Sequence, residues 1–219
     1  MAKDYHDYFI KDGRHIGRYE EMYRECPDPW NIEKLGLRLD MQAAALLLVG
    51  YERRVKRFLD VGAGLGFFTE FLARNIWQAN PEARGLVTDI SSEAVKRATE
   101  KLNDPRLEFQ ALDVRTLARY PILPPAGFDL VVLAQVLWGL LENLNETLAA
   151  LAALLPPNGL MLVSQHFPGT ERQTYGRETV SSPQDLAYCL KAAGLTVINT
   201  LETNRLVNHH WAAILSKDA

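Results

Sequence analysis

Hydrophobic residues occur along most of the chain in short apolar runs that alternate with segments of helical periodicity. Apolar runs of about four to eight residues between turn residues predict buried strands, and apolar positions spaced about three and four apart predict helices. Strands are expected over residues 57–61, 85–89, 106–112, 128–134 and 160–164. Helices are expected over residues 66–78, 91–102, 141–155 and 182–193. This alternation is typical of a doubly wound α/β sheet.

The segments on either side of this alternation complete the predicted fold. Residues 31–55 have apolar positions at helical spacing and predict a helix that ends at Gly50. The end of the chain predicts two strands, over residues 195–202 and 209–216, joined by a turn near Asn204. We therefore expect a single-domain, Rossmann-like doubly wound α/β sheet, mostly parallel, with an antiparallel strand in a C-terminal hairpin.

The first 30 residues have a different character, because aromatic side chains stand among charges and no long apolar pattern is present. A short helix is expected over residues 18–24, and Pro27 and Pro29 predict a rigid turn after it. The segment is either a terminal arm that packs one or two aromatic rings or a lid over a ligand site. We divide the chain into an arm and helix, residues 1–55, and a sheet domain, residues 56–219.

The charge and cysteine content narrow the possible partners. The formal net charge of −3 provides no basic field for nucleic acid or an anionic membrane. Cys26 and Cys189 lie far apart without ligand spacing, so we expect no disulfide framework and no metal site. The polar N-terminus predicts no secretory signal, and the apolar run at 43–49 is too short to span a bilayer. These features predict a cytoplasmic monomer or homodimer.

Candidate chemistry is concentrated where the first predicted strand ends. Asp60 is followed by Gly62, Gly64 and Gly66 before the next helix begins. Glycines allow a turn in which backbone N–H groups approach a ligand without an intervening Cβ atom. Small ligands bind at such strand–glycine–helix junctions in doubly wound sheets.

Two more acids end the second and third predicted strands, Asp89 and Asp113. The carboxyl ends of parallel strands meet at one edge of the sheet, so we expect both acids to lie near the glycine turn. Asp89 comes 23 residues after Gly66, close to the position of an acid that accepts hydrogen bonds from ribose hydroxyls. A glycine turn with a ribose acid suits either a dinucleotide or an adenosyl sulfonium cofactor.

The position of the third glycine distinguishes between these two candidate cofactors. A dinucleotide turn needs a glycine three residues after the second glycine, and Phe67 stands there. The spacing of Gly62, Gly64 and Gly66 after Asp60 instead resembles the first motif of the class I S-adenosylmethionine-dependent methyltransferases.

The resemblance continues through residues 58–165. Asp89 matches the ribose-binding acid of that family, and Asp113-Val114 matches the pair that holds the adenine. Phe128-Asp129-Leu130-Val131 matches its fourth-strand motif, and Asn158 replaces the first of two glycines in a turn of the "LxPGG" type. The resemblance implies S-adenosylmethionine as cofactor, a class I methyltransferase domain over residues 56–219, and cofactor contacts by Asp60, Gly62, Gly64, Gly66, Asp89, Ile90, Asp113, Val114 and Gln135.

Other segments of the chain resemble a smaller group within this family. Asp28-Pro29-Trp30, the segment 134–138 and a histidine-rich last strand look similar to the NodS-like methyltransferases. That group includes N-methyltransferases acting on the amino sugar of chitooligosaccharides. Gln135 departs from it, because the group has an acid at this position. Trp30 and Arg18 of the arm are further candidates for contact with the cofactor, and Arg18 could pair with its carboxylate.

The methyl group of this cofactor is already activated, so the protein must chiefly align the acceptor, and a hydroxyl acceptor also benefits from a base. Candidates lie at the carboxyl edge: His166 after the fifth strand, Gln135 after the fourth, and His209 and His210 after the hairpin turn. Neighbouring residues of a strand point to opposite faces, so one of His209 and His210 should face the cleft.

The sequence thus predicts an enzyme that methylates oxygen or nitrogen of a small polar, sugar-like acceptor. Ala134-Gln135-Val136-Leu137 stands where methyltransferases of DNA bases have an Asn/Asp-Pro-Pro-Tyr/Phe tetrapeptide, so nucleic acid is not the expected substrate. Two alternatives remain open at this point: an NAD-dependent oxidoreductase and a catalytically silent protein that binds an adenosyl cofactor.

Overall fold

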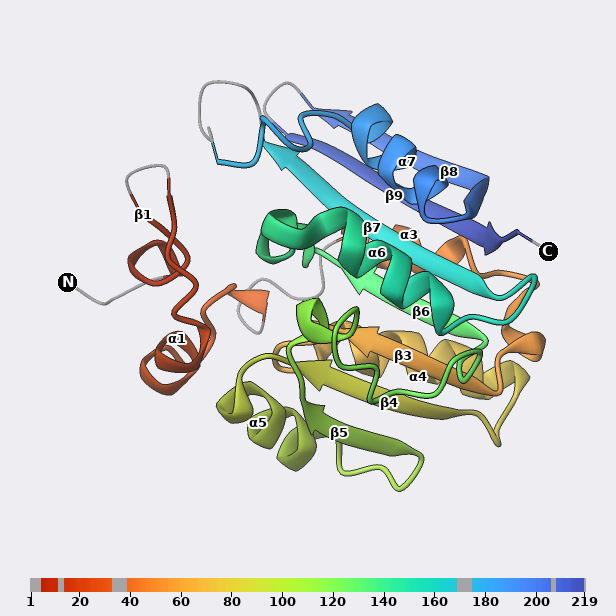
Figure 1. The fold of residues 1–219 in the computed structure, drawn as a ribbon. Helices are drawn as coiled ribbons and strands as arrows, with labels where there is room; N and C mark the ends of the chain where they lie inside the picture. Colours follow the sequence, from red (N-terminus) through yellow and green to blue (C-terminus); the bar gives the residue numbers. More distant parts are fainter. Residues whose placement is uncertain (1–4, 12–13, 33–38, 169–174, 206–207, 219) are drawn as a thin grey trace.

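A computed structural model describes residues 5–11, 14–32, 39–168, 175–205 and 208–218. Its centre is a seven-stranded sheet in the order β5-β4-β3-β6-β7-β9-β8 (Figure 1). The strands are β3 Arg57–Val61, β4 Arg84–Asp89, β5 Leu107–Ala111, β6 Leu130–Ala134, β7 Leu160–Pro168, β8 Leu195–Arg205 and β9 Asn208–Lys217. β3 to β7 pair in parallel, and β9 pairs antiparallel with β7 and β8. The predicted fold class is confirmed.

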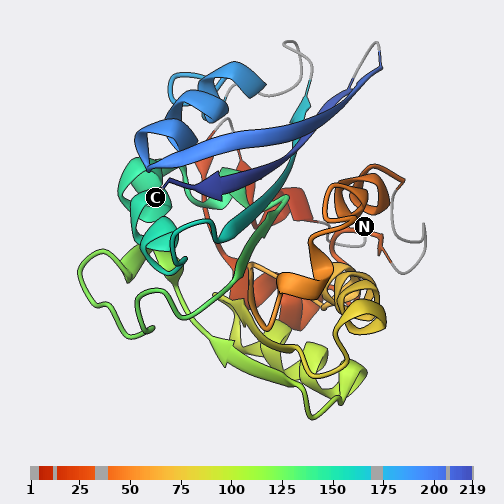
Figure 2. The same cartoon turned by 90° about the vertical axis from the view of Figure 1, so that its right-hand side faces the viewer.

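Helices cover both faces of this sheet (Figures 1 and 2). The described helices after residue 38 are α3 Leu39–Leu46, α4 Phe67–Ala79, α5 Ser92–Leu102, α6 Leu144–Ala153 and α7 Pro183–Ala192, with short 3₁₀ turns η2 Glu52–Arg54, η3 Val114–Thr116, η4 Leu137–Gly139 and η5 Leu141–Asn143. One core cluster joins β3 and β6 to α6 and α7, and the second joins the other side of these strands to α3 and α4.

The central strand β6 illustrates why the apolar runs are continuous. Val131 and Leu133 belong to the cluster beneath α6 and α7, whereas Leu130 and Val132 belong to the cluster beneath α3 and α4. A parallel strand covered by helices on both faces buries every side chain, so it has no polar alternation. This burial fixes the strand end, and therefore the position of the loop that follows Ala134.

The C-terminal hairpin brings the end of the chain back to the same edge of the sheet. β8 is antiparallel to β9, and β9 is antiparallel to β7, so β8 runs in the direction of the parallel strands. His166 is paired with His210, and Phe167 with His209. The start of β9 therefore lies beside the carboxyl end of β7, where the candidate histidines were expected.

Several predicted boundaries are wrong. The turn expected near Asn204 does not form there, because Asn204 and Arg205 belong to β8 and pair with His209 and Asn208 of β9. The helix expected over residues 141–155 spans Leu144–Ala153.

The helix expected to end at Gly50 stops at Leu46, because the backbone tightens into turns in which Leu47, Leu48 and Val49 donate to carbonyls three residues earlier. Residues 33–38 of that predicted helix lie outside the described residues. His166 does not follow the fifth strand but lies within β7, which its pairing with β9 extends to Pro168.

The N-terminal arm, described over residues 5–11 and 14–32, packs against the carboxyl edge of the strands (Figure 1). It contains η1 Tyr5–Asp7, the short strands β1 Ile10–Lys11 and β2 Arg14–His15, and α1 Tyr19–Glu25. Met22 and Tyr23 of α1 pack with Leu65 of the glycine turn and Ala94 of α5 in a third apolar cluster. In the described part of the chain, no helix is long and apolar enough to cross a membrane.

Candidate functional site

The glycine turn between β3 and α4 has a backbone that other residues rarely adopt. Gly62, Gly64 and Gly66 have φ angles of 66°, 56° and 74°. A Cβ atom on Gly62 would lie 2.4 Å from Val136 Cγ2, and one on Gly66 would lie 2.9 Å from Leu102 Cδ1. Both the left-handed backbone and the close neighbours therefore require glycine. The turn forms a backbone cradle at the sheet edge, in which Gly62 is partly exposed and Gly64 and Gly66 are buried.

Asp60 lies beneath this turn. Its side chain is buried and accepts a hydrogen bond of 2.6 Å from Thr69 Oγ1 in α4. Burial raises the pKa of Asp60 to about 7, against the effect of the Thr69 hydrogen bond. This contact ties the end of β3 to the first turn of α4, so Asp60 holds the two sides of the glycine turn together.

Asp89, at the end of β4, joins that strand to the turn. Its two carboxylate oxygens accept hydrogen bonds of 2.9 Å from the backbone N–H groups of Gly64 and Ser91. Burial raises the pKa of Asp89, and the backbone hydrogen bonds oppose this effect. Ile90, the next residue, is exposed. The acid and the glycine turn are thus in direct contact.

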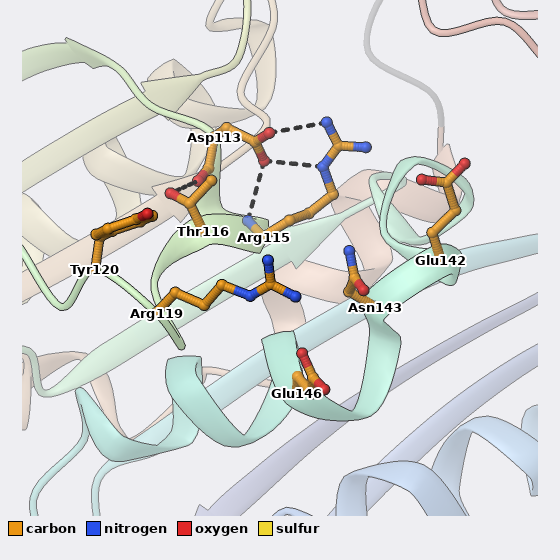
Figure 3. Close-up of a pocket in the computed structure, with 8 residues that line it drawn as sticks. All are labelled: Asp113, Arg115, Thr116, Arg119, Tyr120, Glu142, Asn143 and Glu146. Atoms are coloured by element: carbon orange, nitrogen blue, oxygen red, sulfur yellow. Dashed lines mark hydrogen bonds and ion pairs between the residues drawn. The ribbon is translucent and has the colours of Figure 1, made fainter.

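Asp113, after β5, faces a polar pocket of about 290 Å³ (Figure 3). Its two carboxylate oxygens accept hydrogen bonds from Arg115 Nε and Nη2 at 2.9 and 2.8 Å, and this contact lowers the pKa of Asp113. Val114 beside it is buried. The other residues that line the pocket come from η3 and the segment after it, and from η5 and α6: Thr116, Arg119, Tyr120, Glu142, Asn143 and Glu146.

The end of β6 carries a network that sequence reasoning found only in part. Gln135 has a φ of 60°, and its side-chain oxygen accepts the N–H of His166 at 3.0 Å. Its amide nitrogen donates to Ser164 Oγ at 3.2 Å, and Ser164 Oγ lies 2.9 Å from His210 Nε2. The structure therefore brings Gln135, the His166 backbone and His210 together, with Ser164 as the residue that sequence reasoning missed.

His209 lies on the other side of β9, as the alternation of strand side chains predicts. Its Nε2 is 3.3 Å from Glu202 Oε2, and 28% of its side chain is exposed. Its ring lies 6.2 Å from that of Phe167, and the Phe167 ring lies 6.0 Å from that of Trp138. His209 therefore belongs to an aromatic row, apart from the buried network of His210.

The two arm residues that the sequence singled out have different surroundings. Trp30 donates its indole N–H to Tyr23 Oη at 3.0 Å, and that oxygen would lie 2.7 Å from a Cβ atom on Gly64. Arg18 is exposed and forms an ion pair of 3.6 Å with Glu21. Sequence reasoning missed Tyr23, although its spacing of four residues from Tyr19 places both phenols on one face of α1.

The residues present fit an adenosyl cofactor. A backbone cradle that no Cβ atom fills lies in contact with a buried carboxylate at the next strand end. The sequence also matches the family described as a methyltransferase domain over residues 59–161, which spans β3 through the start of β7. Residues 59–161 thus carry a methyltransferase domain, and the chain is similar to the class I S-adenosylmethionine-dependent methyltransferases.

Curated relatives agree with this family. The methyltransferase is 29% identical over 147 residues to nodulation protein S of Rhizobium tropici, covering 64% of this chain and 57% of that protein. It is 26% identical over 160 residues to a malonyl-[acyl-carrier protein] O-methyltransferase of Halalkalibacterium halodurans, covering 73% of this chain and 56% of that protein. The matched region thus spans little more than half the length of these two relatives.

The fold is shared with solved methyltransferases. The N-methyltransferase NodS of Bradyrhizobium japonicum, in complex with S-adenosyl-L-homocysteine, superposes with a TM-score of 0.68 at 18% identity, covering 92% of this chain and 99% of that chain. The carbon methyltransferase CurJ superposes with a TM-score of 0.66 at 19% identity, covering 82% of this chain and 54% of that chain. The family identifies S-adenosylmethionine as the cofactor, so a dinucleotide is not the ligand of this glycine turn.

Proposed function

We propose that this methyltransferase transfers a methyl group from S-adenosylmethionine to an oxygen or nitrogen atom of a small polar, sugar-like acceptor. The observation that carries the proposal is the direct contact between the glycine turn and the buried Asp89 carboxylate. Relatives whose names state N-methyl and O-methyl transfer support both acceptor atoms. Bound S-adenosylmethionine supplies a methyl group that its sulfonium has already activated.

The cofactor contacts follow from the residues at the sheet edge. In this proposal, the backbone of Gly62, Gly64 and Gly66 lies against the cofactor, with Asp60 supporting the turn from below. Asp89 and Ile90 hold the ribose, and Asp113 and Val114 hold the adenine. Asp113 keeps lone pairs for this purpose, since each carboxylate oxygen can accept more than one hydrogen bond.

Gln135 and the arm complete the proposed cofactor site. Gln135 follows β6 and precedes Val136, which packs over Gly62. We propose that residues 1–55 form the arm and helix that cover this edge of residues 56–219. Trp30 and Arg18 belong to the arm, and in this proposal they contact the cofactor once it has entered and the arm has moved to cover it. The third apolar cluster, which joins α1 to the glycine turn, supports this role as a lid.

The candidates for contact with the acceptor divide into two groups. His210, with Gln135 and the backbone of His166, belongs to the buried network around Ser164, which suits the positioning of neighbouring groups. His209 is partly exposed beside Phe167 and Trp138, which suits direct contact with an acceptor. An amine acceptor needs only its neutral form, whereas a base is worth about 10²–10⁴-fold for a hydroxyl.

Two experiments test the proposal. Calorimetric titration with S-adenosyl-L-homocysteine and with NAD should give binding of the first and none of the second. Incubation with methyl-labelled S-adenosylmethionine and a panel of amino sugars, hydroxylated sugars, small amines and carboxylic acids should then label an amino or hydroxyl compound. Cofactor binding without labelling of any acceptor would favour the silent binding protein, and labelling of carboxylic acids alone would overturn the proposed acceptor class.

A further inference from the structure

The arm of this methyltransferase reaches into the glycine cradle itself. Tyr23 is only 4% exposed, and its hydroxyl would lie 2.7 Å from a Cβ atom on Gly64. That hydroxyl accepts the indole N–H of Trp30, so the phenol is held from the side of the arm. Burial and the nearby Asp89 carboxyl both raise the pKa of Tyr23. The phenol therefore stands over the Gly64 backbone and close to Asp89.

Glu20 fastens the start of α1 to α5. Its carboxylate accepts hydrogen bonds from Ser91 Oγ at 2.7 Å, Ser92 Oγ at 2.8 Å and the Glu93 N–H at 3.2 Å. Burial opposes ionisation of this group, but these three hydrogen bonds lower the pKa of Glu20 to about 2. The carboxylate also lies at a helix N-terminus, where the helix dipole favours negative charge.

Arg97 fastens the other end of α1 to the same helix. Its guanidinium donates to the carbonyl oxygens of Tyr23 at 3.0 Å and Cys26 at 3.3 Å, and also to that of Pro27. The last carbonyls of a helix lack partners within it, so a cation there satisfies them. Glu20 and Arg97 thus hold α1 at both ends while Tyr23 lies in the cradle between them.

We infer that this position of the arm is a self-inhibited state in which Tyr23 occupies space that the cofactor needs, so that α1 must leave α5 before the cofactor enters. The inference rests on the proposed function, because it assigns the cradle at Gly64 and Asp89 to the cofactor. Of two pockets of about 290 and 330 Å³, the first lies beside Asp113, and neither is lined by Gly62, Gly64 or Asp89. In this inference, Trp30 and Arg18 make their proposed cofactor contacts only after α1 has moved. The opposite arrangement, in which the arm in its present position already forms part of the cofactor site, predicts effects of opposite sign.

The first test measures the association rate of S-adenosyl-L-homocysteine by stopped-flow tryptophan fluorescence, with Kd from calorimetry. Glu20→Gln and Arg97→Ala each remove charge-assisted contacts that hold the arm closed. Each should raise the association rate constant and lower the Kd by about tenfold or more, since a hydrogen bond to a charged group contributes on that scale. Slower association or weaker binding in both variants would overturn the inference.

Matched controls carry the same chemical changes away from the arm. Asp185→Asn alters an acid that accepts hydrogen bonds from Ser181 beside the start of α7, and Arg74→Ala removes an exposed ion pair with Glu70 on α4. Both should bind as the unaltered chain does. Failure of all chains to bind S-adenosyl-L-homocysteine would overturn the proposed function together with the inference, whereas binding with unchanged rates in the arm variants would overturn the inference alone.

A second test needs no substitution. Hydrogen exchange of the backbone amides of Tyr19–Glu25 should speed up when the unaltered chain is saturated with S-adenosyl-L-homocysteine, because α1 loses its contacts with α5. Exchange that is unchanged or slower would contradict the inference and would indicate that α1 keeps its contacts with α5 when the cofactor is bound.

Discussion

Replacing Asp89 with asparagine exchanges one oxygen for an amide nitrogen at the point where β4 meets the glycine turn. In the native chain the two carboxylate oxygens each accept one backbone N–H, from Gly64 and from Ser91, at 2.9 Å. Asparagine has a single acceptor oxygen, so one of these N–H groups would face the donor side of the new amide. The substitution therefore changes hydrogen bonding with almost no change in volume.

The size of the effect follows from these contacts. Hydrogen bonds to charged groups contribute about 1.5–3 kcal/mol. For folding, part of that loss is offset, because burial raises the pKa of Asp89 and the neutral amide avoids the cost of burying charge. For the free energy of cofactor binding, no such compensation is expected. Loss of a charged ribose acceptor predicts a Kd for S-adenosyl-L-homocysteine raised by about ten- to 150-fold.

Calorimetric titration of Asp89→Asn and of the unaltered chain measures this effect. Asp104→Asn is the matched control, since Asp104 pairs with Arg106 at the opposite end of α5 from Ser91. The control should bind S-adenosyl-L-homocysteine as the unaltered chain does. Equal Kd values for Asp89→Asn and the unaltered chain, with both folded, would refute the assignment of Asp89 to the ribose.

Three further predictions concern the supports of the site. Burial raises the pKa of Asp60 from 3.8 to about 7, so ionisation of Asp60 destabilises the fold. The stability that the protonated carboxyl contributes is therefore fully present below about pH 4 and is lost as the pH rises through 7. Thermal unfolding should therefore show Asp60→Asn more stable than the native chain at pH 8, and this advantage should disappear by about pH 4; a constant difference would contradict the raised pKa. Gly62→Ala places a Cβ atom 2.4 Å from Val136 Cγ2. Urea unfolding should therefore show that Gly62→Ala lowers the free energy of unfolding by about 1–3 kcal/mol more than Gly50→Ala does, because Gly50 also has a positive φ but no neighbour within 4 Å. Equal decreases in the two variants would refute the contact. His209→Asn should lower kcat for a hydroxyl acceptor by about 10²-fold or more and leave the Kd for S-adenosyl-L-homocysteine unchanged, and an unchanged kcat would exclude His209 as the base.

Local physics explains which parts of the fold could be predicted. Strands β3, β4 and β6 are buried on both faces, so their apolar runs are visible in the sequence, and the glycines and acids at the strand ends follow directly. The turn at Asn158 was also predictable, because its φ of 62° is one that asparagine tolerates. Local patterns thus determined the sheet and the candidate cradle.

Contacts between distant segments were not predictable in this way. β7 extends to Pro168 only because β9 pairs with it, and the hydrogen bonds of Glu20 to the start of α5 join residues about 70 positions apart. The sequence did not predict the φ of 60° at Gln135, because this conformation is typical of glycine and asparagine rather than glutamine. These features depend on tertiary packing, which periodicity and motif spacing do not encode.

A crystal structure of the methyltransferase with S-adenosyl-L-homocysteine tests the central claim most directly. We predict ribose hydroxyls within hydrogen-bonding distance of the Asp89 carboxylate, the ligand against the backbone of Gly62 and Gly64, and Tyr23 displaced from Gly64. At least one of His166, His209, His210 and Gln135 should line the cavity beside the sulfur. A ligand bound elsewhere, with Asp89 and the glycine turn untouched, would contradict the account.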